Sequence, residues 1–212
     1  MVTQRTARTS GLVNRGVELT NMNAMKQLFD DIKRTVNHAR MCHEAWWFLH
    51  GTNPMREMIL NVYNNYLDIF ETIRPALYTS FIVKLASVFD NDKKSISLKR
   101  VIREIEKSTS KSFEPARIDF DDLWERGRKL FKYRNKVIAH RDKKVTSRNF
   151  AKETGFKYDD LKAILEDVST FLDEASLFVG KGEFYRFSNT SDFERLINDL
   201  SKIAQQTAVA DR

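Results

Sequence analysis

The stretch DFDDLWERGRKLFKYRNKVIAHRDKK, residues 119–144, has the periodicity that decides the class of fold. Two stripes run along it, one of Leu123, Gly127, Leu130, Arg134, Val137 and Arg141 at steps of four and three, and one of Trp124, Phe131 and Ile138 at steps of seven. Such spacing is typical of one face of an α-helix, so the stretch predicts a helix over 119–140 that opens at Asp119. Arg134 and Asn135 lie in the middle of its apolar face.

The rest of the chain repeats this helical spacing. Seven glycines and three prolines in 212 residues leave few helix breakers, although Pro75 is expected to kink or split the helix that contains it. The fold is therefore predicted to be an all-α bundle of about six helices. Besides 119–140, the predicted helices are 25–49, 54–88, 98–107, 161–178 and 192–206.

Helix starts and domain boundaries can also be predicted. We expect a flexible basic tail over 1–18, a helical bundle over 19–182, and a C-terminal linker and helix over 183–212 that pack on the bundle. The residues suited to start helices are Asn53 with Pro54, Ser97, and Ser191 with Glu194 as a capping box.

The composition excludes several classes of protein. A single cysteine, Cys42, cannot form an internal disulfide, and no apolar run approaches the roughly 20 residues of a membrane-spanning helix. We therefore expect a soluble, cytoplasmic protein without membrane contact. The motifs of P-loop nucleotide hydrolysis, dinucleotide binding and zinc proteolysis are absent from the sequence. Cys42 lies on the apolar stripe of its helix, and His38 and His43 do not share one helix face, so neither a metal site nor a cofactor is expected.

Positive charge is concentrated in one part of the chain. The net charge is +7, and residues 128–148 contain nine lysines and arginines against Asp142 alone, a net charge of +8. Clustered cations displace counterions from a phosphate backbone, so this segment favours binding of a polyanion such as nucleic acid. An ordinary solvated helix face is the alternative interpretation.

Arg134 and His140 raise a geometric question. A guanidinium on an apolar face needs partners, since an unpaired buried charge costs several kcal/mol. Either a carboxylate such as Asp68 or Asp90 pairs with Arg134, or the side chain lines a cleft or subunit interface that is open to a ligand. Six residues of ideal helix rotate His140 by about 240° relative to Arg134. The two side chains can share a site only if the helix ends near Ala139 or a second copy of the chain contributes.

The residues of this region resemble a known family. Arg134, Asn135 and, after four further residues, His140 are similar to the R-N-x-x-x-x-H motif of the HEPN superfamily. Residues 139–142 (AHRD), residues 85–90 (LASVFD) and the helix start at residues 97–98 resemble the AbiU branch of that superfamily, which is associated with bacterial abortive infection by phage. The resemblance implies an HEPN-like helical bundle that forms a two-fold homodimer with the two motifs facing each other.

The resemblance also implies a metal-independent endoribonuclease that acts in phage defence or as a toxin. Arg134 would bind the scissile phosphate, Asn135 would position groups by hydrogen bonding, and His140 would act as general acid or base. The expected partners are RNA, a second copy of the chain, and an antitoxin or regulatory protein. A non-catalytic HEPN module that binds nucleotide, RNA or protein is the alternative, and a plain helical scaffold is a third. The residues expected to hold the flanking RNA backbone are Lys132, Lys136, Arg141, Lys143 and Lys144.

Overall fold

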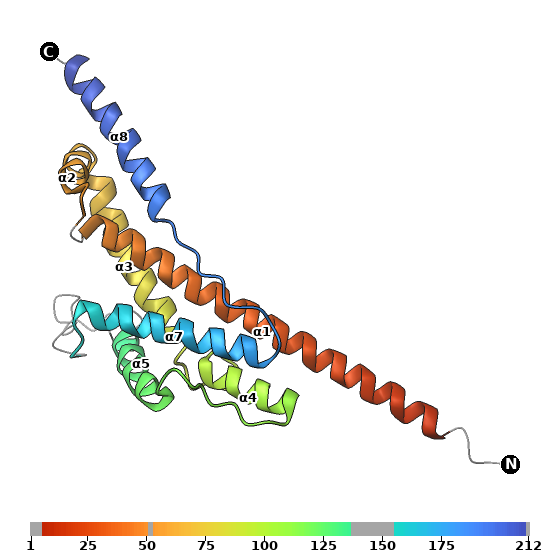
Figure 1. Ribbon diagram of the computed structural model, residues 1–212. Helices are drawn as coiled ribbons and strands as arrows, with labels where there is room; N and C mark the ends of the chain where they lie inside the picture. The colour runs from red at the N-terminus through yellow and green to blue at the C-terminus, as the bar shows by residue number, and fades with distance from the viewer. Residues whose placement is uncertain (1–5, 51–52, 137–154, 211–212) are drawn as a thin grey trace.

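The computed structural model describes residues 6–50, 53–136 and 155–210, and over these residues every regular element is a helix (Figure 1). The prediction of an all-α fold is confirmed. No helix in this described part has the length and apolarity that crossing a membrane requires. The helices are α1 (Thr6–His50), α2 (Arg56–Asn65), α3 (Leu67–Ser87), α4 (Leu98–Thr109), α5 (Phe120–Arg134), α7 (Tyr158–Phe178) and α8 (Thr190–Ala210).

The long helix α1 is the axis of the molecule. Figure 1 shows its N-terminal part extending beyond the other helices, whereas α3, α4, α5 and α7 gather along its middle and C-terminal parts. Helix α8 packs on α2 and on the end of α1, at the other end of the molecule from α4. The arrangement therefore places α5, the helix that carries Arg134, within the main group of helices.

Two separate hydrophobic cores hold the helices together. The main core forms where α1, α3, α4, α5 and α7 meet, and it includes the fully buried Phe29, Phe81, Phe89, Leu130 and Phe171. Helices α1 and α3 continue from this core into the second one, so they connect the two ends of the molecule. The second core consists of Phe48, Leu49, Ile59, Val62, Phe70 and Ile197, from α1, α2, α3 and α8.

The break within predicted helix 54–88 lies at Tyr66, whereas Pro75, which was predicted to kink or split this helix, does not split it. Tyr66 leaves the helical conformation, with φ −128° and ψ 40°, after two asparagines that favour helix interiors poorly. Pro75 lies inside α3. Both Pro75 and Glu71 are exposed, so the carbonyl group of Glu71 that loses its N–H partner can bond to water instead.

Helix starts also differ from the predictions in several places. Residues 6–18, predicted to belong to a basic tail, are helical, since α1 begins at Thr6. The prediction of a capping box at Ser191 is wrong, because α8 begins at Thr190. The backbone carbonyl of Asn189 accepts the first hydrogen bond of this helix, from the N–H group of Phe193. The Asn189 side chain bonds to the carbonyl oxygen of Met41 instead and so ties the start of α8 to α1. Ser97 does precede α4 as predicted, but its hydroxyl makes no capping hydrogen bond.

Candidate functional site

Helix α5 is fixed in place from two sides. Asp119 caps its start as predicted, because the Asp119 carboxylate accepts a hydrogen bond from the backbone N–H of Asp122 at 3.0 Å. The ring of Phe89 lies directly on Gly127, where an added Cβ would come within 2.0 Å of a ring carbon. On its other side α5 is tied to α7, since Arg126 forms an ion pair with Asp167 at 2.6 Å.

The regular helix, predicted to run to residue 140, ends earlier, at Arg134 of the predicted site. The α-helical conformation stops at Arg134, and Asn135 and Lys136 continue the chain as a wider π-helical turn. Such turns interrupt the regular rotation of a helix and are frequent at functional sites. Asn135 and Lys136 therefore depart from the ideal rotation of about 100° per residue on which the value of about 240° is based. His140, and with it Arg141, Lys143 and Lys144, lies outside the described residues.

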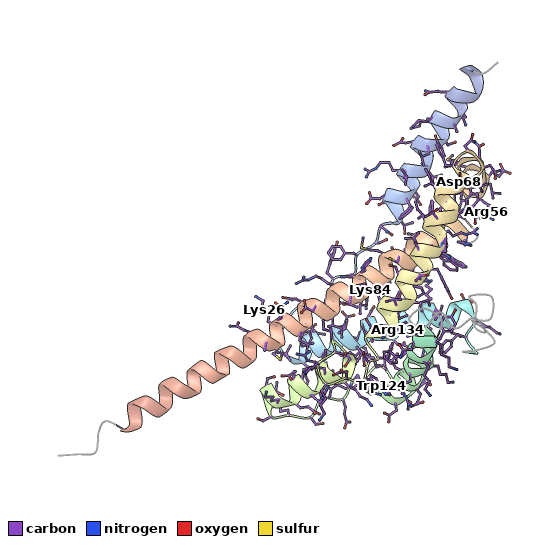
Figure 2. All side chains as sticks on the ribbon, turned by 180° about the vertical axis from the view of Figure 1, so that it is seen from behind. Lys26, Arg56, Asp68, Lys84, Trp124 and Arg134 are labelled. Atoms are coloured by element: carbon purple, nitrogen blue, oxygen red, sulfur yellow. The ribbon has the colours of Figure 1, made fainter. Side chains whose placement is uncertain are left out.

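Arg134 is half-buried, and among the described residues it has no acidic partner. Its guanidinium carbon lies 4.6 Å from the centroid of the Phe131 ring, which is a cation–π contact. Its Nε is buried without a hydrogen-bond partner, and within the described part of the chain no carboxylate forms an ion pair with it. Figure 2 shows Asp68 near the far end of α3 from Arg134, and Asp90 bonds to the backbone of its own turn. The paired-arginine alternative is thus not found among these residues.

Buried Tyr133, next to Arg134 in sequence, and partly buried Tyr78, which interacts with Tyr133, are both neutral. Burial raises the pKa of Tyr133, the residue before Arg134. Burial also raises the pKa of Tyr78 on α3, and Tyr133 adds to that rise. Both phenols therefore keep their protons near neutral pH. Neither supplies the negative charge that would neutralise the guanidinium.

The other predicted site residues on α5 lie toward solvent. Asn135 is half-buried, and Lys132 and Lys136 are exposed. Arg128, earlier on the same helix, is neutralised by Glu125 at 3.1 Å. Arg134, Asn135 and two exposed lysines thus lie at one end of α5, and within the described residues neither lysine forms an ion pair. This arrangement is suited to binding a phosphate group.

A second group of cations lies next to this helix, and the sequence reasoning missed it. The segment KKSISLKRVIR, residues 93–103, contains five basic residues and no acidic one. Lys99 of this segment places its amine 4.1 Å from the centroid of the Trp124 ring on α5. Counting charge only along 128–148 could not reveal cations that the fold brings to the same helix. The run of basic residues without acids was the available signal.

The fold and the Arg-Asn pair at the end of α5 are those of an HEPN domain. Comparison with protein families makes this more specific: the family model HEPN_AbiU2, described as AbiU2, matches residues 22–207. The chain belongs to the AbiU2 family and is an HEPN domain related to abortive infection. No curated protein and no solved structure matches the chain.

Proposed function

We propose that this HEPN domain is a metal-independent endoribonuclease that acts in phage defence or as a toxin. The observation that carries the proposal is Arg134, which is half-buried and has a buried Nε without a partner at the point where α5 ends. An unsatisfied buried donor costs about 1–3 kcal/mol, so this N–H group does not stabilise the fold. A phosphate group bound at this point would supply the missing acceptors.

In the proposed reaction, Arg134 binds the scissile phosphate and stabilises the charge that develops on it. The 2′-oxygen of RNA attacks phosphorus and gives up its proton, the bond to the 5′-oxygen breaks, and that oxygen takes up a proton. His140 transfers these protons, because an imidazole titrates near neutral pH. Asn135 orients His140 or the phosphate by a hydrogen bond. The products are a 2′,3′-cyclic phosphate and a 5′-hydroxyl end.

The site works in a homodimer with the two motifs facing each other, so that each copy can complete the cleft of its partner. RNA is held by the lysines and arginines that flank the motif, and an antitoxin or regulatory protein restrains the enzyme in the cytoplasm. The flanking cations are Lys132 and Lys136, which are exposed, and Arg141, Lys143 and Lys144.

RNA digestion tests this proposal directly. The purified chain is incubated with single-stranded RNA and excess chelator, and the products are examined for cyclic-phosphate ends. His140→Ala should abolish cleavage and leave the melting temperature unchanged. Arg134→Lys should keep the charge but lose the forked geometry, and cleavage should fall about 100-fold or more. Arg195→Gln on α8, an exposed residue, is the control and should cleave like the wild type.

Two results would contradict the proposal that this domain is an endoribonuclease acting through Arg134 and His140. If the wild-type chain binds RNA but leaves it intact with and without divalent ions, the domain is the non-catalytic binding module. If His140→Ala cleaves as fast as the wild type, the activity does not come from the proposed site.

A further inference from the structure

A groove between α4 and the start of α5 has the features of a second RNA-contact site. Its volume is about 430 Å³, within the range of pockets that hold small ligands. Five of its residues come from α4 and the turn before it, and Phe120 comes from α5. The groove is lined by Asn91, Lys93, Lys99, Ile102, Arg103 and Phe120.

The charge of this groove is not compensated. Lys93, Lys99 and Arg103 are exposed, and none of them forms an ion pair with a carboxylate of the described residues. In contrast, Arg126 and Arg128 on the neighbouring helix are both paired with carboxylates. The Asp92 carboxylate, in the turn before α4, accepts a hydrogen bond from the backbone N–H of Lys94 and pairs with none of these three cations. The groove therefore keeps its positive charge for an external anion.

The aromatic residues beside the groove continue toward Arg134. Phe120 and Trp124 stack at 6.0 Å between ring centroids, and Lys99 lies over Trp124. Phe131, which underlies Arg134, follows Trp124 by seven residues and so lies on the same side of α5. Figure 2 shows Trp124 and Arg134 along one helix. Ten residues separate them, about 15 Å along the helix axis, which several nucleotides of an extended strand can span.

We propose that the α4–α5 groove binds the backbone of the same single-stranded RNA that is cleaved at Arg134, several nucleotides away from the scissile phosphate. This inference rests on the proposed function. Proteins bind single-stranded nucleic acid by combining cations along its phosphate backbone with aromatic side chains on which bases stack. The groove thus extends the cleavage site and sets how much RNA flanking the cut is needed.

The test uses the double variant Lys93→Gln/Arg103→Gln, because Lys99 packs on Trp124 and its removal would change that contact. The matched control is Arg195→Gln/Lys202→Gln on α8, which removes the same charge from two exposed residues at the opposite end of the molecule (Figure 1). Binding is measured by fluorescence anisotropy with a labelled, 2′-O-methylated single-stranded RNA that cannot be cleaved. Thermal melting verifies that both variants fold.

Loss of two phosphate contacts should weaken binding by about 25-fold at about 0.1 M salt, and the slope of log affinity against log salt should shrink by about 1.4. The control should bind like the wild type. With unmodified RNA the groove variant should show a raised KM. Shortening the RNA to the nucleotides around the cut should remove the difference between variant and wild type.

The outcomes separate this inference from the proposed function. If the wild type cleaves RNA and the groove variant keeps the wild-type KM, affinity and salt slope, the proposal that the groove binds RNA is refuted. The proposal that the domain is a nuclease is then still supported. If the groove variant binds 2′-O-methylated RNA weakly but the wild type never cleaves, the proposal of a nuclease is refuted. The proposal that the groove binds RNA is then still supported. Equal weakening by the α8 control would show a non-specific charge effect and would also refute the groove.

Discussion

Replacing Gly127 by alanine should destabilise the protein through one identifiable contact. The new Cβ would lie 2.0 Å from Cδ1 of Phe89 and 2.2 Å from two further ring atoms, so the ring would have to move by about 1.4 Å to reach the 3.4 Å of ordinary contact. Phe89 is only 1% exposed and packs against Trp124, so it has little room to move. Overpacking of this kind lowers the free energy of unfolding by up to about 3 kcal/mol. Alanine offsets about 1 kcal/mol of this loss, because it favours the helix more than glycine does. The expected net loss is about 2 kcal/mol.

Urea unfolding followed by circular dichroism measures this loss, and thermal unfolding should show a drop of about 4–8 °C. Gly182→Ala is the matched control, because its Cβ would meet open space, and it should change stability by less than about 0.5 kcal/mol. Phe89→Leu should make room for the methyl group, so Gly127→Ala should cost less in that background than alone. A Gly127→Ala protein as stable as the wild type or more so would refute the argument, since only the helix-propensity gain would then remain.

Three further predictions concern buried and capping groups. Burial, together with Lys162 and Arg40, lowers the pKa of His43 from 6.5 to about 4, so the unfolded chain binds the proton first as pH falls. Urea unfolding should therefore show about 2 kcal/mol less stability at about pH 5 than at about pH 7, and His43→Gln should remove most of that difference. Arg134→Met should abolish cleavage yet keep the unfolding free energy within about 1 kcal/mol, because it also removes an unpaired buried donor; a loss above about 3 kcal/mol would reveal a structural ion pair. Asp119→Ala should cost about 1 kcal/mol through the lost helix cap, and thermal unfolding should show Asp119→Asn to be milder.

Most helices could be predicted from the sequence because their apolar stripes are long. The stripe over 161–178 lies within α7 (Tyr158–Phe178), and the stripe over 98–107 lies within α4. Asp119 was predicted correctly because an acidic N-cap acts within one helical turn. Such signals are local, so neighbouring residues are enough to read them.

The errors concern features that depend on tertiary surroundings. Whether Pro75 breaks a helix depends on whether the freed carbonyl group is exposed, and the Asn189 side chain, before the start of α8, bonds to Met41, 148 residues away in sequence. The α4 cations were missed for the same reason, since only the fold brings Lys99 onto Trp124. The candidate site was found from its motif residues, whereas the unpaired state of Arg134 could be known only from the packing around it.

The contacts that fix α5 also fix Arg134 at its end, which has no ion pair with a carboxylate of the described residues. The helix is held by Asp167 on one side and by the Phe89 ring on the other, and the chain departs from regular helix only after Arg134. A group on a rigid element needs little reorganisation when it meets its ligand, so binding energy is not spent on ordering it. If Gly127→Ala shifts α5, RNA cleavage should therefore fall more than the modest loss of stability explains. The folded fraction of a protein several kcal/mol stable barely changes when about 2 kcal/mol is lost. Cleavage that stays at the wild-type rate in a Gly127→Ala protein would show that the position of α5 does not limit the reaction.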